Sequence, residues 1–294
     1  MRLAIISDSH YPWNLTKLTI LASRFGYNEQ FYVNLDSFYD NIDAKQVKAL
    51  IFNGDFGWDL FLFPFIREVL EKIDPMWFFY PLVQLAIVRE HVDAKIPLIF
   101  TEGNHDFWFH LVENQLNDKG FGELHLNIIK FRQYLTQFAL SRSKITQIVE
   151  ALLGYYTNLP GVENSTILIA KNVILLRNSG IKIENVLMYG MPWYEKKNPP
   201  VPWTAYKKKL VEDYHVFIMK NNNLTLPNKI VIFHHRNPPT LNFVQEFADV
   251  NLHSFCYGHW HGIRGSLVEK YKIYGPGLCV MPERNNFHPL ILDL

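Results

Sequence analysis

Five short apolar runs, each long enough for one β-strand, end in a cluster of polar residues. Uniformly apolar runs of this length are typical of strands that are buried on both faces of a parallel sheet. Ligands of open α/β sheets sit beyond the carboxyl ends of such strands, so the five clusters are expected to point toward one site. The runs cover residues 3–6, 49–52, 97–100, 229–233 and 254–257, and the clusters after them are Asp8-Ser9-His10, Asn53-Gly54-Asp55, Gly103-Asn104-His105-Asp106, His234-His235 and Gly258-His259-Trp260-His261.

The segments between these runs favour helices and further strands. Residues 60–91 and 124–156 carry apolar residues at helical spacing, which predicts helical insertions near 60–95 and 120–157. Residues 166–177 and 186–191 have the pattern of further strands, and short strands are expected to recur after residue 262. Residues 192–202 are expected to form a loop, and the lack of a linker or internal repeat predicts a single domain over residues 1–294.

The composition excludes several classes of protein. With 48% hydrophobic and 19% charged residues among 294, the chain is not disordered over most of its length. A formal net charge of +1 argues against a uniformly basic nucleic-acid-binding surface, and two cysteines cannot supply a disulfide framework. The apolar runs are too short for a membrane span or a secretory signal, so a cytoplasmic enzyme is the expected class.

The polar clusters together offer carboxylate, amide and imidazole groups, a ligand set that suits divalent first-row metals. Two cations close together need a bridging carboxylate, and Asp55 is the natural candidate. The absence of cysteine ligands argues against a structural zinc site. This chemistry is compatible with Mn, Fe, Zn, Co or Ni, of which Mn is favoured.

In their order along the chain, the five motifs resemble those of the calcineurin-like metallophosphoesterases. The resemblance spans residues 8–261 and implies an α/β fold, a four-layer α/β/β/α sandwich of two mixed β-sheets with a two-metal site at the strand ends. His105 matches the histidine that this family places by the leaving-group oxygen, and Asp106 follows it in the motif. The implied ligands are Asp8, His10, Asp55 and His261 for one ion, and Asp55, Asn104, His234 and His259 for the other.

The fourth motif offers two neighbouring histidines. Neighbouring residues of a strand face opposite sides, so only one of them is expected to bind metal. In the family the ligand usually comes first after the strand, so the resemblance favours His234. His235 and Arg236 are then candidates for contact with the phosphate of the substrate.

The expected activity is hydrolysis of phosphoesters, with phosphodiesters such as nucleotides favoured, by attack of a metal-bridging hydroxide. One alternative is a DNA nuclease of the double-strand-break repair type, which the near-neutral charge disfavours. Another is a lipid or nucleotide pyrophosphohydrolase that resembles the UDP-diacylglucosamine hydrolases, whose lipid would contact the apolar residues 60–88. A non-enzymatic scaffold is disfavoured because every ligand position is filled. Aromatic residues near the motifs, Trp193 among them, are candidates for stacking on a base.

Overall fold

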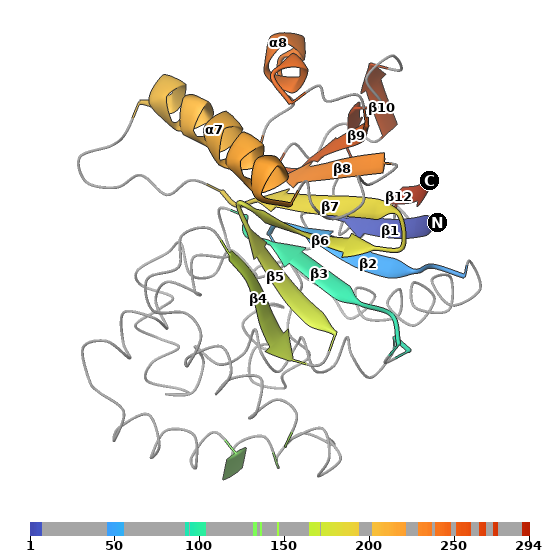
Figure 1. The fold of residues 1–294 in the computed structure, drawn as a ribbon. Helices are drawn as coiled ribbons and strands as arrows, with labels where there is room; N and C mark the ends of the chain where they lie inside the picture. The colour runs from blue at the N-terminus through green and yellow to red at the C-terminus, as the bar shows by residue number, and fades with distance from the viewer. Residues whose placement is uncertain are drawn as a thin grey trace, which may run out of the picture.

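The computed structural model describes residues 1–7, 46–55, 92–93, 95–103, 132–133, 136, 146, 165–170, 172–193, 202–221, 229–236, 239–247, 251–259, 265–268, 273–275 and 290–294. These residues form two six-stranded sheets and two helices (Figure 1). The first sheet has the order β12-β1-β2-β3-β5-β4, with β1 Arg2–Ile6, β2 Ala49–Asn53, β3 Leu98–Thr101, β4 Ser165–Ala170, β5 Val173–Arg177 and β12 Leu290–Asp293. The second has the order β10-β11-β9-β8-β7-β6, with β6 Ser179–Ile183, β7 Val186–Met191, β8 Lys229–His234, β9 Leu252–Tyr257, β10 Gly265–Val268 and β11 Ile273–Gly275.

Both sheets are mixed and follow the same plan. In each sheet four inner strands run parallel, and an antiparallel strand closes each edge. Parallel inner strands place all of their carboxyl ends at one edge, where the polar clusters begin. The expected α/β class with two mixed sheets is therefore confirmed.

The two sheets pack face to face around a shared apolar core. Alternate residues of each strand point inward, as the two-residue period of a strand requires. The first sheet contributes Leu3, Ile5, Ala49, Ile51, Ile99, Ile174, Leu176 and Leu292, and the second contributes Val186, Met188, Val231, Phe233 and Cys256. Because this core joins both sheets, it fixes the position of the strand ends of one sheet relative to those of the other.

Helix α7 (Trp203–Asn221) covers the outer face of the second sheet (Figure 1). Its buried residues Tyr206, Leu210 and Tyr214 recur at intervals of four, so they lie on one side of the helix. They pack with the outward-facing residues of β7, β8 and β9. They also pack with Phe243 and Val244 of the short helix α8 (Leu241–Gln245) and with Phe247, which follows this helix. Helix, second sheet and first sheet thus make three successive layers. The described elements do not include the fourth layer that the resemblance implies. The segments near 60–95 and 120–157, where helical insertions are expected, lie almost entirely outside the described residues.

The five apolar runs that end in polar clusters are confirmed as β1, β2, β3, β8 and β9, and residues 186–191 as β7. The strand pattern of residues 166–177 corresponds to two antiparallel strands, β4 and β5, which are joined beside Asn172 at a φ of 58°. A positive φ reverses the chain within two residues, which asparagine tolerates better than most residues. The short strands expected after residue 262 are β10, β11 and β12.

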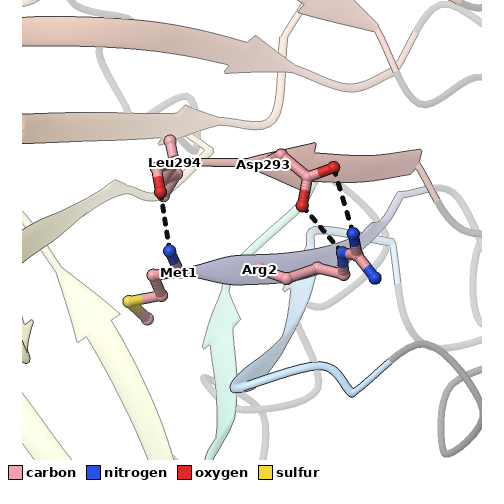
Figure 2. A network of polar contacts seen from close by, with 4 residues as sticks. All are labelled: Met1, Arg2, Asp293 and Leu294. Carbon is pink, nitrogen blue, oxygen red and sulfur yellow. Dashed lines mark hydrogen bonds and ion pairs between the residues drawn. The ribbon is translucent and has the colours of Figure 1, made fainter.

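The last strand, β12, pairs with the first, so the two ends of the described chain lie side by side (Figure 1). Figure 2 shows the contacts that accompany this pairing: the amino group of Met1 donates to the carbonyl of Leu294 at 2.6 Å, and Arg2 Nε donates to Asp293 Oδ1 at 2.7 Å. Both side chains of the ion pair are exposed, so its contribution to stability is small. No helix within the described ranges combines the length and the apolar character that crossing a bilayer requires.

Candidate metal centre

The inward-facing rows of the two sheets change from apolar to polar at the carboxyl ends of their strands. Ser7, Asn53 and Thr101 continue the inward-facing rows of β1, β2 and β3, and all three are buried. Hydrogen bonds join these residues to the second sheet: Asn53 Nδ2 donates to the carbonyl of Cys256 at 3.4 Å, and Thr101 Oγ1 donates to that of Met191 at 3.0 Å. The strand ends of both sheets therefore meet in one polar region.

Asp55, His235 and His259 come together in this region. Their potential ligand atoms all lie within 4.8 Å of one another. Asp55 follows β2 of the first sheet, whereas His235 and His259 follow β8 and β9 of the second. The side chains of Asp55 and His235 have no exposed area, and a carboxylate buried in this way requires a compensating cation.

The hydrogen bonds of His235 orient its ring toward Asp55. Nδ1 lies 2.7 Å from the carbonyl oxygen of Asn53, and because a carbonyl only accepts, Nδ1 carries the proton. Nε2 lies 2.9 Å from Asp55 Oδ2, and in the neutral ring it has the lone pair that a metal ion would bind. Two ligands bound at right angles to one metal at about 2.1 Å lie about 3 Å apart. The pair thus fits a shared metal ion, and an N–H donated to a backbone carbonyl is the usual support for a metal-binding histidine.

His234 points to the opposite side of the sheet. It continues the outward-facing row of Ile230 and Ile232, and its ring lies among Phe243 and Phe255, with centroids 6.2 and 6.5 Å away. Burial, with smaller effects of Arg236 and His235, lowers the pKa of His234 to about 3. The structure therefore groups His235, rather than the expected His234, with Asp55. The two histidines do face opposite sides, as expected. Because β8 includes His234, the first histidine after the strand is His235, and it is His235 that faces Asp55.

The other expected site residues lie outside the described residues. They are the remaining ligand candidates Asp8, His10, Asn104 and His261, and the candidate catalytic residues His105 and Asp106. Arg236, expected to contact phosphate, is described: its guanidinium carbon lies 3.3 Å from the ring centroid of Trp203 and 5.4 Å from that of Trp193.

The backbone around the cluster is strained, which is common at functional sites. Asp55 and His259 have φ values of 51° and 69°, a region that residues other than glycine rarely adopt. Gly54, at a φ of 77°, also approaches His235 closely, and a Cβ at Gly54 or at Gly258 would overlap the His235 ring. The chain reaches this geometry only because these two positions lack side chains.

The sequence did not reveal a buried ion pair whose residues position Trp193 against the cluster. Arg177 donates to both carboxylate oxygens of Glu102, at 2.9 and 2.7 Å, and both side chains are buried. The carbonyl of Glu102 accepts from the backbone N–H of Trp193 at 2.7 Å, and the indole of Trp193 packs on His259 with centroids 4.8 Å apart. The position of Glu102, directly before Gly103-Asn104, was the one signal in the sequence for this role.

The chain is an α/β protein with two mixed sheets. At their common edge lies a cluster of carboxylate and imidazole groups that fits a metal ion. The family model of the calcineurin-like phosphoesterases matches residues 1–262, and the chain belongs to this family. Its activity is the metal-dependent hydrolysis of phosphoesters. A search of curated proteins finds no match to the chain.

Proposed function

We propose that this chain hydrolyses phosphodiesters, such as nucleotides, with two divalent metal ions bound at the joint edge of its sheets. The observation that carries the proposal is the geometry of His235, whose Nδ1 is bound to the Asn53 carbonyl while its Nε2 faces Asp55. His235 therefore replaces His234 in the ligand set. One ion would be held by Asp8, His10, Asp55 and His261, and the other by Asp55, Asn104, His235 and His259.

The metal ions, when bound, would neutralise phosphate oxygens and lower the pKa of a bound water to give a nucleophile, and manganese is the favoured metal. The protein contributes the geometry. Asp55 would offer its buried carboxylate to both ions, and the carbonyl of Asn53 from the opposite sheet orients His235. His105 would deliver a proton to the leaving-group oxygen, with Asp106 next to it in the chain. The sharing of one sheet by β1 and β12 supports a single domain over residues 1–294.

A metal and substrate panel tests this proposal. Protein stripped with a chelator receives Mn, Fe, Zn, Co or Ni and is assayed on bis(4-nitrophenyl) phosphate, 4-nitrophenyl phosphate and a single-stranded oligodeoxynucleotide. We expect metal-dependent hydrolysis that is fastest on the small diester. Faster cleavage of the oligonucleotide would instead favour the nuclease.

Asp55→Asn is the decisive variant in this panel, since it removes the charge assigned to both ions. We expect it to abolish hydrolysis and to displace at least one metal. Glu212→Gln is the matched control, because Glu212 is an exposed carboxylate on α7 that pairs only weakly with Lys208 at 3.6 Å. Two metals per chain in an active Asp55→Asn protein would overturn the assignment.

A further inference from the structure

A pocket of about 260 Å³ opens beside the metal cluster, between the start of α7 and the segment that follows β8. Asp55, His235 and His259 are not among the described residues that line it. The described lining residues are Trp203, Lys207, His234, Arg236, Pro239, Thr240 and Phe243. The wall thus combines aromatic rings with two cations and a buried imidazole.

Arg236 supplies the excess positive charge of this pocket. Its guanidinium lies over Trp203, which holds it in place through cation–π attraction. Burial lowers the pKa of Arg236 from its ordinary value without removing the charge. Within the described part of the chain, no carboxylate forms an ion pair with Arg236. A half-buried guanidinium of this kind is suited to a carboxylate or phosphate, which it binds through two parallel hydrogen bonds.

The second cation is already neutralised. Lys207 Nζ lies 3.0 Å from Glu246 Oε1 and 5.0 Å from the ring centroid of Phe243. Among the described lining residues the net excess is therefore one positive charge, which one negative group would balance. The apolar rings of Trp203 and Phe243 would contact the rest of the occupant.

His234 adds a polar group to the pocket. The residue is 3% exposed, and its Nε2 is a buried atom with no hydrogen-bond partner in the part of the chain that the structure describes. A buried polar atom without a partner is costly, and it lines this cavity. An occupant that hydrogen-bonds to Nε2 would remove this cost.

Trp193 lies between the metal cluster and Arg236 of the pocket wall. Its ring centroid lies 4.8 Å from that of His259 and 6.2 Å from that of His235, and 5.4 Å from the guanidinium carbon of Arg236. Trp193 is not among the residues that line the pocket, but it lies near both the cluster histidines and Arg236 of the pocket wall. An ester arm of a phosphodiester bound at the metal cluster would reach Arg236 if it passed along Trp193.

We propose that this pocket is the subsite for the ester arm that stays on phosphorus, and that it selects arms in which an apolar group carries one negative charge. This inference rests on the proposed phosphodiesterase activity, because that activity places the phosphate beside Trp193. It assigns Arg236 to the distal arm of the substrate rather than to the reacting phosphate.

Two diesters with the same leaving group test the selection. The substrates are 4-nitrophenyl 4-carboxyphenyl phosphate and 4-nitrophenyl phenyl phosphate, from which water displaces 4-nitrophenolate in both cases. We expect the carboxylate to lower KM by about tenfold or more, with little change in kcat. A hydrogen bond to a charged group strengthens binding by about this factor. Arg236→Gln should remove the preference. Lys208→Gln, which neutralises the neighbour of Lys207 on the exposed side of α7, should keep it. An equal KM for the two substrates in the wild type, or a preference that survives Arg236→Gln, would overturn the proposal.

Direct binding separates failure of the pocket from failure of the proposed activity. Calorimetry on the full chain with Mn restored uses 2-naphthalenesulfonate, an apolar ring with a fixed charge, and 2-naphthol as its neutral counterpart. We expect the sulfonate to bind at least tenfold more weakly to Arg236→Gln than to the wild type, and 2-naphthol to distinguish them much less. Arg236-dependent binding by a protein that cleaves no ester would support the pocket and reject the activity. Hydrolysis with no Arg236-dependent binding would do the reverse.

Discussion

The carbonyl oxygen of Asn53 lies 2.7 Å from Nδ1 of His235, although 182 residues separate the two in the sequence. The same oxygen accepts a hydrogen bond from Ser7 Oγ at 2.9 Å. A strand end of the first sheet thereby orients a proposed metal ligand of the second. The cluster depends on the packing of the sheets against each other as much as on the residues that would touch the metal.

The two histidines after β8 should differ in their effect on metal content. His235→Ala should lose metal, because it removes a proposed ligand. His234→Leu should retain metal, because His234 lies on the opposite side of the sheet among Phe243 and Phe255. Elemental analysis of the two purified variants makes the comparison. Metal loss in His234→Leu alone would restore the assignment that the family pattern favours.

His105→Asn should discriminate between leaving groups. A proton donor is needed most for a poor leaving group, so the loss should be about 10²- to 10⁴-fold on an alkyl ester. Nitrophenolate leaves as a stabilised anion, so the loss on a nitrophenyl ester should be small. Steady-state rates on the two esters, with metal content as the control, measure the difference. Equal losses with both metals in place would exclude proton donation by His105.

Breaking the buried pair of Glu102 and Arg177 should strongly destabilise the fold. Glu102→Gln leaves a buried guanidinium without its charged partner, at a cost of about 3–5 kcal/mol in the free energy of unfolding. The double variant Glu102→Leu/Arg177→Met should cost less, since no unpaired charge remains. Lys208→Gln breaks an exposed pair and should cost less than about 1 kcal/mol. Urea unfolding measures all three, and a double variant that is less stable than Glu102→Gln would contradict this account.

The stability of the protein should fall at alkaline pH partly through Cys256. Burial raises the pKa of the Cys256 thiol, whereas the unfolded thiol ionises near its ordinary value. Above that value the unfolded state binds fewer protons than the folded state, so stability decreases as pH rises, by up to about 1.4 kcal/mol per pH unit. Below it this contribution is fully present. Cys256→Ala should show a shallower decline between pH 8 and pH 10 in urea unfolding, and an identical slope would reject the role of the thiol.

Local sequence patterns predicted the strands but not the faces that they present. Residues 230–233 are apolar at every position, so the sequence alone does not show that Val231 and Phe233 face the other sheet while Ile230 and Ile232 face α7. That choice decides which histidine joins Asp55. Helix α7 was not predicted, because its apolar side is narrow: only Tyr206, Leu210 and Tyr214 are buried along 19 residues.

The supporting contacts of the site were beyond sequence reasoning for a different reason. Glu102 and Arg177 are 75 residues apart, and Asn53 and Cys256 are 203 apart. Contacts of this kind depend on how the sheets pack, and spacing along the chain carries no signal for them. By contrast, the potential of Asp55 as a metal ligand was predictable, because it belongs to a short motif directly after a strand.

The pairing of β12 with β1 has a consequence for synthesis on the ribosome. Arg2 and Asp293 are 291 residues apart, so at about 5–20 residues per second roughly 15–60 s separate the appearance of β1 from that of its antiparallel neighbour. During this interval β1, which leads directly into Asp8, has one open edge. The first sheet therefore reaches its final width only when translation of residues 290–293 is complete, and a nascent chain stalled before them would expose an unpaired strand edge that is prone to association.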